Sequence, residues 1–506
     1  MLKHIALLVG IGLWSVALAE EKKIDPKTFF GIQVVDDQTG RGVPLVEFRT
    51  TAACTYYTDS NGWIAFYEPG LMNRRVYFEV SSNGYQIKPD GLGIHGVTLE
   101  TTQGETRKIE IHRLNIAERL YRVTGAGIYR DSVLLGQKTP IEQPLLNAEV
   151  TGQDSVMNVL HNNKLYWFYG DTGKISYALG NFAMTGATTE LPGKLDPEKG
   201  ISLHYFTNER GTMKAMSPMA GEGVVWLLGI VNLKGSEGRD KMLAFYHRRR
   251  GMGAVLDNGF VIYNDQKEEF EILKRVPLEA PVFPTGSTAH VRVDETNYIY
   301  FTNPYPSLRV KADYDAYLDL ASYEAYTCYK AGTKELDRAA DGKLVWGWKK
   351  GGQPINPMEQ AELVKKGKMK LEESEHRLAD AASGKAILLN NCSCFWNEYR
   401  KKYIMIASEV LGDTGLGEVW YSESERPEGP WTKATKIVTH ANKKDDAHDL
   451  YNPAHHPFLD REGGRVIYFE GTYSNGFSGN KHSTPWYEYN QIMYKLDLAD
   501  PRLKLD

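Results

Sequence analysis

A β-rich hairpin recurs four times in the C-terminal two thirds of the chain. Each copy has a run of aromatic and branched residues, a polar turn and a second such run, which is typical of an antiparallel hairpin. The copies span residues 154–171, 287–303, 391–409 and 452–470. The start of the first strand and the end of the second lie at the same end of such a hairpin. The residues expected to meet are Asp154 with Asp171, Asn391 with Glu409, and Asn452 and His455 with Glu470.

A fifth unit of the same kind lies between the first and second hairpins. Its strands are expected at 223–231, 242–246 and 259–263, with 216–222 as its first strand. Five small sheets of this spacing predict a five-bladed β-propeller over residues 145–506. A helical insertion is expected near 357–384, because this stretch is rich in Glu, Lys, Leu and Ala.

The N-terminal part of the chain follows a separate β pattern. Residues 28–115 contain about seven short apolar runs separated by turn signals such as Asn61-Gly62, and this predicts a small β-sandwich. Residues 116–144 are expected to connect the two regions. The predicted fold class is therefore all-β, with a five-bladed β-propeller preceded by a small β-sandwich domain.

Residues 1–19 have the pattern of a signal peptide. A short basic start is followed by an apolar run over 5–16 and by Ala17-Leu18-Ala19, which fits signal cleavage. We expect a periplasmic or secreted protein with no membrane span after cleavage. Among the four cysteines, Cys392 and Cys394 are expected to be buried free thiols.

The composition changes this picture little. The formal net charge is −4 at pH 7, so no basic footprint for nucleic acid is present. A hydrophobic content of 42% and a charged content of 25% are typical of soluble globular proteins.

The polar ends of the hairpins are the candidate chemistry. The innermost strands of a propeller surround one axis, so these ends would face a shared cavity. Paired carboxylates there suit glycosidic bond cleavage, because one protonates the leaving oxygen and the other activates water or attacks the sugar. The candidate catalytic residues are Asp154, Glu409, Glu470 and His455. The candidate substrate-binding residues are Asp171, His290, Asn303, Asn391, Asn452 and His456.

Two stretches carry family resemblances. Residues 35–48 and 58–66 resemble the carboxypeptidase regulatory-like sandwich. Residues 153–156, followed by the aromatic run 164–169, resemble the first blade of the five-bladed propeller glycosidases of glycoside hydrolase families 43 and 117. A second likeness to these enzymes is the Gly-Pro-Trp segment within 418–431. The resemblance implies that Asp154 is the general base.

The chain also departs from the glycosidase pattern. Ser155 replaces the usual proline, and the position of the family 43 acid element reads Tyr-Asn-Pro-Ala-His-His-Pro over 451–457. The acid is then left to Glu409, Glu470 or a histidine, as the resemblance to family 117 implies. For an inverting enzyme, the carboxyl groups of Asp154 and the acid are expected roughly 6.5–9.5 Å apart.

Other functions stay open at this point. A polysaccharide lyase would use a tyrosine or histidine base, for which His290, His455 and Tyr473 are available. A non-catalytic carbohydrate-binding propeller is the second alternative. In each case the partner is a carbohydrate. No cofactor is certain, and a calcium ion at the propeller axis stays open, although the sequence has no cluster of three histidines for catalytic zinc.

Overall fold

The computed structural model describes residues 24–412, 415–440, 449–475, 478, 480, 482–503 and 505. The expected signal peptide lies outside the described residues. Strands dominate, and the all-β prediction is confirmed. The described α-helices are short: α1 (Arg130–Leu134), α2 (Tyr314–Leu318) and α3 (Pro357–Lys365).

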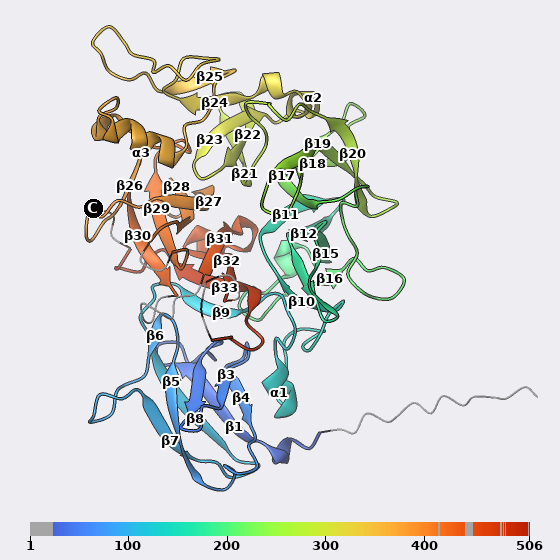
Figure 1. The fold of residues 1–506 in the computed structure, drawn as a ribbon, viewed down its shortest axis with the longest axis vertical. Helices are drawn as coiled ribbons and strands as arrows, with labels where there is room; N and C mark the ends of the chain where they lie inside the picture. Colours follow the sequence, from blue (N-terminus) through green and yellow to red (C-terminus); the bar gives the residue numbers. More distant parts are fainter. Residues whose placement is uncertain are drawn as a thin grey trace, which may run out of the picture.

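Two four-stranded sheets form the N-terminal region, drawn in blue in Figure 1. The first contains β4 (Trp63–Phe66), β1 (Phe30–Asp36), β8 (Thr106–Arg113) and β6 (Tyr85–Gln86). The second contains β3 (Thr55–Tyr57), β2 (Glu47–Thr50), β5 (Arg75–Ser81) and β7 (Gly96–Glu100). Alternate residues of β5 are buried because successive side chains of a strand point to opposite faces. One hydrophobic core, with Ile32 and Phe78 at its centre, joins the two sheets.

Five further sheets follow along the chain, and we number them one to five. Sheet one contains β11 (Val156–His161), β12 (Lys164–Tyr169), β15 (Thr185–Thr189) and β16 (His204–Tyr205). Sheet two contains β17 (Val224–Lys234), β18 (Asp240–Arg249), β19 (Val255–Asn264) and β20 (Glu269–Arg275). Sheet three contains β21 (Ser287–Val293), β22 (Thr296–Thr302), β23 (Pro306–Lys311), β24 (Glu324–Thr327) and β25 (Gly347–Lys350).

Sheets four and five complete the set. Sheet four contains β27 (Leu389–Asn397), β28 (Lys402–Glu409), β29 (Glu418–Ser424), β30 (Trp431–Thr439) and β26 (His376–Asp380). Sheet five contains β31 (Asp449–His455), β32 (Val466–Ser474), β33 (Tyr489–Asp497) and β9 (Glu118–Arg122). The four hairpins expected from the sequence are present as the antiparallel pairs β11–β12, β21–β22, β27–β28 and β31–β32.

The first strands of the five sheets contact one another in a closed order. β11 contacts β17, β17 contacts β21, β21 contacts β27, β27 contacts β31, and β31 contacts β11. Figure 1 shows the five sheets arranged in this order around a centre. A small extra sheet of β10 (Val150–Gln153), β13 (Thr172–Lys174) and β14 (Tyr177–Asn181) stands beside sheet one.

Hydrophobic layers between consecutive sheets hold this arrangement together. Trp167 and Phe168 are neighbours on β12, so their side chains point to opposite faces of sheet one. Trp167 packs in a layer with Tyr468 of sheet five, whereas Phe168 packs in a layer with Tyr246 of sheet two. Similar layers lie between sheets two and three, three and four, and four and five. The continuous apolar runs of these strands are explained by burial of both faces.

Three boundaries differ from the sequence expectation. The first strand of sheet two is β17, and residues 216–222 form no strand. The helical insertion is limited to α3 and a short 3-10 turn at Leu371–Glu373, because His376–Asp380 forms β26, parallel to β30. The expected connecting segment, 116–144, supplies β9 to sheet five and also contains α1.

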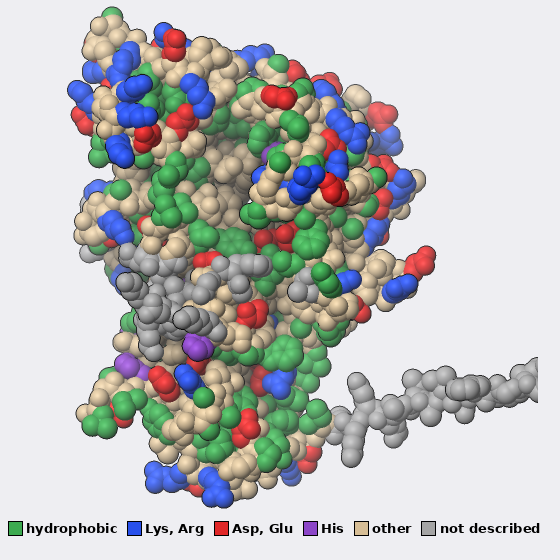
Figure 2. Space-filling view, in the orientation of Figure 1, with side chains coloured by type: hydrophobic (Ala, Val, Ile, Leu, Met, Phe, Trp, Pro, Cys, Tyr) green, Lys and Arg blue, Asp and Glu red, His purple; other side chains and the backbone are tan. Residues whose placement is uncertain are grey.

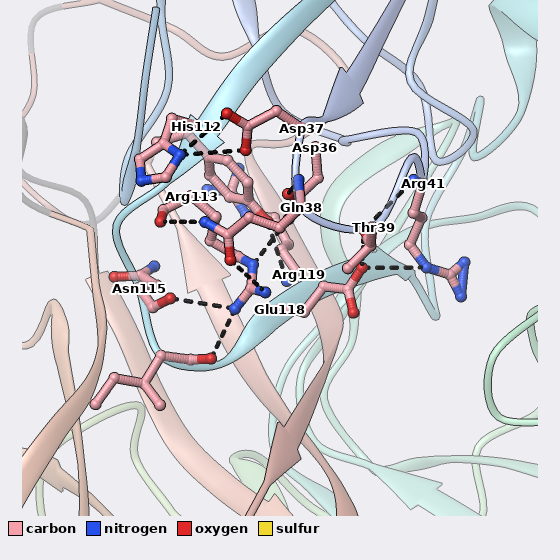
Figure 3. Close-up of polar contacts among 12 residues, drawn as sticks. Asp36, Asp37, Gln38, Thr39, Arg41, His112, Arg113, Asn115, Glu118 and Arg119 are labelled. Atoms are coloured by element: carbon pink, nitrogen blue, oxygen red, sulfur yellow. Dashed lines mark hydrogen bonds and ion pairs between the residues drawn. The ribbon is translucent and has the colours of Figure 1, made fainter. Parts of the chain in front are cut away.

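Strand β9 joins the N-terminal region to sheet five (Figure 3). Arg119 is almost fully buried, and its Nη1 donates to the carbonyl oxygens of Pro44 and Leu45 at 3.0 and 3.3 Å. Just before the strand, Nε of Arg113 donates to Oδ2 of Asp36 at 2.8 Å. The buried Arg119 therefore links sheet five to the N-terminal region, whereas the Arg113–Asp36 pair lies within that region.

Candidate functional site

The site expected at the hairpin ends begins at Asp154, between β10 and β11. Its backbone N–H donates to the carbonyl oxygen of Asp171 at 3.4 Å, and its own carbonyl oxygen accepts from Gly170 at 2.8 Å. A Cβ atom at position 170 would lie 2.2 Å from Oδ1 of Asp154, so glycine leaves the space that this carboxylate occupies. The structure thus brings Asp154 and Asp171 together.

Two tyrosines of sheet five face the Asp154 carboxylate. The Tyr451 hydroxyl lies 3.4 Å from Oδ2 of Asp154, and Tyr489 also hydrogen-bonds to this side chain. Burial, with a smaller contribution from the nearby charge of Asp171, raises the pKa of Asp154 to about 7, although the hydrogen bonds from Tyr489 and Tyr451 oppose the shift. Asp154 can therefore exchange a proton near neutral pH.

Asp171 connects this group to sheet two. The indole Nε1–H of Trp226, on β17, donates to Oδ1 of Asp171 at 3.0 Å. Burial raises the pKa of Asp171, and the bond from Trp226 opposes the shift. Trp226 is half-buried, and the guanidinium carbon of Arg249 lies 5.5 Å from the centre of its ring. An aromatic face is thus fixed next to the two carboxylates.

A chain of polar side chains links sheets four, five and one at the same end of the first strands. Nδ2 of Asn391 donates to Oδ1 of Asn452 at 3.0 Å, and Nδ2 of Asn452 donates to Oγ of Ser155 at 2.5 Å. The backbone N–H of Ser155 donates to Oγ1 of Thr472 at 3.1 Å. Asn391 and Asn452, expected to bind substrate, therefore also hold the strand starts in place beside Asp154.

Glu409 ends β28 at this end of sheet four. The neighbouring residue, Ser408, is in register with Asn391, and Oε2 of Glu409 accepts from the indole N–H of Trp420 at 2.9 Å. Glu409 is only 5% exposed, and burial raises its pKa. A carboxyl group in this environment tends to hold its proton, which a general acid requires.

Glu470, His455 and His456 lie away from the group around Asp154. Glu470 is fully buried, and its Oε1 lies 3.2 Å from Nε2 of His456, whose ring packs edge-on against Trp167 between sheets five and one. Nε2 of His455 lies 2.8 Å from Oδ1 of Asp460, and His455 is 4% exposed. In the described part of the chain neither Glu470 nor His455 is recorded in contact with Asp154.

The position of Glu470 has a simple geometric cause. β32 extends four residues beyond Glu470 to Ser474, which is in register with Asp449 at the start of β31. Glu470 therefore lies in the middle of its strand and points into the layer between sheets. His455 is the last residue of β31 and lies at the other end of that strand.

His290 and Asn303 belong to sheet three. His290 lies on the first strand, β21, where it is exposed to solvent, and partial desolvation lowers its pKa. Asn303 is exposed and its Nδ2 donates to Oγ1 of Thr285 at 3.1 Å. Neither has a recorded contact with Asp154 or Asp171 among the described residues.

The surface of the molecule is hollowed at the centre of the five sheets. Figure 2 shows the molecule hollowed between the sheets, with acidic side chains in the hollow. No group of three or more His, Cys, Asp or Glu side chains is gathered as a metal site in the part of the chain that the structure describes. In the same residues, no helix is long and apolar enough to cross a membrane.

Three residues of the site were not expected from the sequence. Tyr451 directly precedes Asn452, which is a predicted substrate-binding residue. The alternation of side chains along a strand predicts that Tyr451 and Asn452 point to opposite faces. Trp226 and Tyr489 lie on strands outside the four hairpins, so the hairpin pattern gave no signal for them. An aromatic residue on the first strand of the neighbouring sheet is the signal that could have found Trp226.

Comparisons with known proteins find similarity only among solved structures. No protein-family model matches the sequence, and no curated protein matches it. The chain is similar to an exo-β-1,3-galactanase of Phanerochaete chrysosporium, with a TM-score of 0.37, 12% identity, and coverage of 70% of this chain and 63% of that one. It is also similar to a GH43_1 enzyme of Xanthomonas citri, with a TM-score of 0.32, 12% identity, and coverage of 69% and 89%.

This chain thus spans less than two thirds of the galactanase. At 12% identity, the substrate of this chain does not follow from either of these similarities.

Proposed function

We propose that this chain is an exported glycoside hydrolase that cleaves a poly- or oligosaccharide by acid–base catalysis. We further propose that its fold is a five-bladed β-propeller preceded by a β-sandwich, which the closed order of first-strand contacts supports. Export rests on the signal pattern of residues 1–19. The observation that carries the catalytic proposal is the Asp154 carboxylate, with a pKa of about 7, beside Asp171 and two tyrosines.

Asp154 is the general base of the proposed mechanism. A base works best when its pKa lies near the working pH, since it must be ionised before the reaction and still accept a proton. Tyr451 and Tyr489 donate to its carboxylate and fix its orientation. Asp171 acts on the base through its charge and holds Trp226 as a face on which a sugar ring can stack.

Glu409 is the proposed general acid. It lies at the same end of sheet four as Asn391, its pKa is raised by burial, and it would protonate the leaving oxygen. Glu470 and His455 are not assigned to the reaction, because both are buried against partners in the layers between sheets.

The lyase alternative receives less support from the site. A lyase base must give up its proton at the working pH. Burial and the charge of Asp154 raise the pKa of both Tyr451 and Tyr489 above the ordinary tyrosine value, which disfavours their ionised forms. The neighbouring tyrosines are therefore better suited to donate hydrogen bonds to Asp154.

Kinetics with leaving groups of different acidity test the roles. We expect Asp154→Asn to lose at least about a hundredfold in turnover on every substrate, since a general base is needed for all of them. Glu409→Gln should lose activity on natural glycans but retain it on aryl glycosides with acidic phenol leaving groups, which need no protonation. The exposed Trp396, which has its ring against Tyr403, provides the control Trp396→Ala.

Several outcomes would contradict these assignments. Loss of activity on natural glycans, with retention on aryl glycosides, in Asp171→Asn rather than in Glu409→Gln would transfer the acid role to Asp171. Products with ultraviolet absorbance and no new hydrolytic reducing end would show a lyase. Binding of glycans without any cleavage by the wild-type protein would favour a binding propeller.

A further inference from the structure

A second groove lies at the junction of the N-terminal region and sheet five. It has a volume of about 640 Å³ and contains neither Asp154 nor Asp171. One wall comes from β1, β4 and the turns next to them. The other includes Glu118 of β9, Lys495 of β33 and Glu198 from the loop between β15 and β16 of sheet one. Oγ1 of Thr39 donates to Oε1 of Glu118 at 2.9 Å across this junction (Figure 3).

The charged side chains of the groove neutralise one another. Arg41 lies between two carboxylates, with its Nε 3.8 Å from Oε1 of Glu118 and its Nη2 3.5 Å from Oε2 of Glu198. Nζ of Lys495 lies 2.7 Å from Oε1 of Glu198. Two cations thus face two anions, so the groove offers no excess charge to an ionic ligand. A neutral ligand fits it better than an anion or a cation.

The other polar groups are suited to a ligand with many hydroxyls. Trp63 of β4 is in register with Gln33 of β1, and both side chains point away from the core that Ile64 and Ile32 enter. Trp63 is half-buried, and in the described residues no hydrogen bond is recorded for the Gln33 side-chain amide. An apolar ring face beside an amide matches the two surfaces of a sugar ring, apolar on its face and hydroxylated at its edge.

Hydrogen bonds hold the turn that leads into Trp63 in one conformation. The buried Asp59 accepts hydrogen bonds from the backbone N–H groups of Asn61, Trp63 and Ser132 at 3.0, 3.1 and 2.6 Å. Nδ2 of Asn61 donates to Oγ of Ser132 at 3.2 Å, which leaves the Asn61 side-chain oxygen to accept from a ligand. A wall that is fixed before binding loses little conformational freedom when a ligand arrives.

We propose that the junction groove is a second saccharide-binding site, specific for neutral glycans and separate from the site around Asp154. Trp63 stacks on a sugar ring, and Gln33 and Asn61 bind its hydroxyl groups. The N-terminal region would then hold a polysaccharide on the molecule while the ring of five sheets acts on another part of it. The binding itself does not rest on the proposed hydrolase function.

Affinity electrophoresis of the full chain in the Asp154→Asn background tests this site without turnover. The probes are xylan, galactan and arabinan as neutral polysaccharides and alginate as an anionic one, each cast in a native gel. We expect at least one neutral polysaccharide to retard the protein, and alginate not to. Adding Trp63→Ala should raise the dissociation constant at least tenfold, and adding Gln33→Ala should raise it about threefold.

Two matched variants separate this site from others. Trp396→Ala removes an exposed tryptophan that belongs to neither site and should leave retardation unchanged. Trp226→Ala reports binding at the site around Asp154 alone. If Trp63→Ala lowers the melting temperature, Gln33→Ala on the same sheet face decides the question. Retardation unaffected by changes at Trp63 and Gln33, retardation by alginate alone, or no retardation by any neutral polysaccharide would overturn the proposal.

Discussion

The indole N–H of Trp226 donates to Oδ1 of Asp171 at 3.0 Å and so joins two neighbouring sheets at the end where Asp154 lies. Asp171 is therefore held in one orientation, with its charge acting on Asp154. The relationship assigns Asp171 a positioning and electrostatic role, and it makes the pH dependence of the proposed reaction sensitive to a residue that need not touch the scissile bond.

We expect Asp171→Asn to move the acidic limb of the pH profile of kcat/KM to lower pH. Asn keeps an oxygen that can accept from Trp226 but removes the negative charge that raises the pKa of Asp154. The base would then ionise at lower pH, whereas in the wild type its ionisation falls near pH 7. The measurement is kcat/KM on a soluble glycan between pH 4 and pH 9.

The matched control for this experiment is Asp265→Asn. Asp265 pairs with His161, the last residue of β11, at the other end of that strand from Asp154. The limb should not move in this variant. An unchanged limb in Asp171→Asn would show that the charge of Asp171 does not act on the catalytic base.

Asp154→Asn should stabilise the fold at alkaline pH while it removes activity. The folded-state pKa of Asp154 is raised from 3.8 to about 7, so its contribution to stability is fully present below about pH 4 and is lost as pH rises through 7. A shift of about three pH units corresponds to about 4 kcal/mol, and screening by solvent at this half-buried group reduces the effect. We expect a melting temperature a few degrees above wild type at pH 8 and little difference at pH 4.

Differential scanning fluorimetry at both pH values provides this measurement. A stability penalty in Asp154→Asn at pH 8 would show that the ionised carboxylate supports the fold. In that case Asp154 would be a structural group rather than a base kept in a costly environment.

Glu470→Gln should behave in the opposite way to Asp154→Asn. Glu470 is fully buried beside His456, and the change leaves a polar but uncharged group next to that ring. We expect a loss of stability of about 1–3 kcal/mol, from the altered buried pair, with kcat/KM within threefold of wild type. Denaturant unfolding and kinetics on the same preparation test it. A hundredfold loss of turnover in a stable Glu470→Gln protein would return Glu470 to the catalytic site.

The sequence pattern was sufficient to predict the four hairpins and the proximity of Asp154 and Asp171. The pairing of Asp154 with Asp171 followed from strand polarity, because Asp154 lies just before β11 and Asp171 just after β12, the strand that pairs with it. Glu470 was misplaced because Gly471 follows it, and a glycine commonly marks a strand end, whereas β32 runs through Gly471 to Ser474. An error of four residues moves a side chain from the strand end to a buried layer.

Contacts between residues far apart in the chain could not be predicted from the local sequence pattern either. Strand β9 pairs with β33, although more than three hundred residues separate them in the chain, and no local periodicity encodes that partner. The tyrosine Tyr489 reaches Asp154 for the same reason, since it lies on the third strand of sheet five. Local pattern predicts which residues form a strand, whereas the packing of one sheet on the next decides which side chains meet.

The last prediction concerns the attachment of the N-terminal region. Arg119 is 1% exposed and donates to the carbonyl oxygens of Pro44, Leu45 and Asn83. Arg119→Leu keeps an apolar side chain but leaves these carbonyl oxygens without their charged donor. We expect the free energy of unfolding to fall by about 3–5 kcal/mol, since removing one partner of a buried charged network leaves the others unsatisfied.

Calorimetry distinguishes this expectation from a loosely tethered N-terminal region. If the two regions are one cooperative unit, the wild type unfolds in a single transition and Arg119→Leu shifts the whole transition to lower temperature. The control is Arg107→Leu, which removes an exposed arginine paired with Glu105 and should change stability by no more than about 0.5 kcal/mol. Two separate transitions in the wild type, with only one of them shifted in Arg119→Leu, would show that the N-terminal region folds independently of the sheets on which it packs.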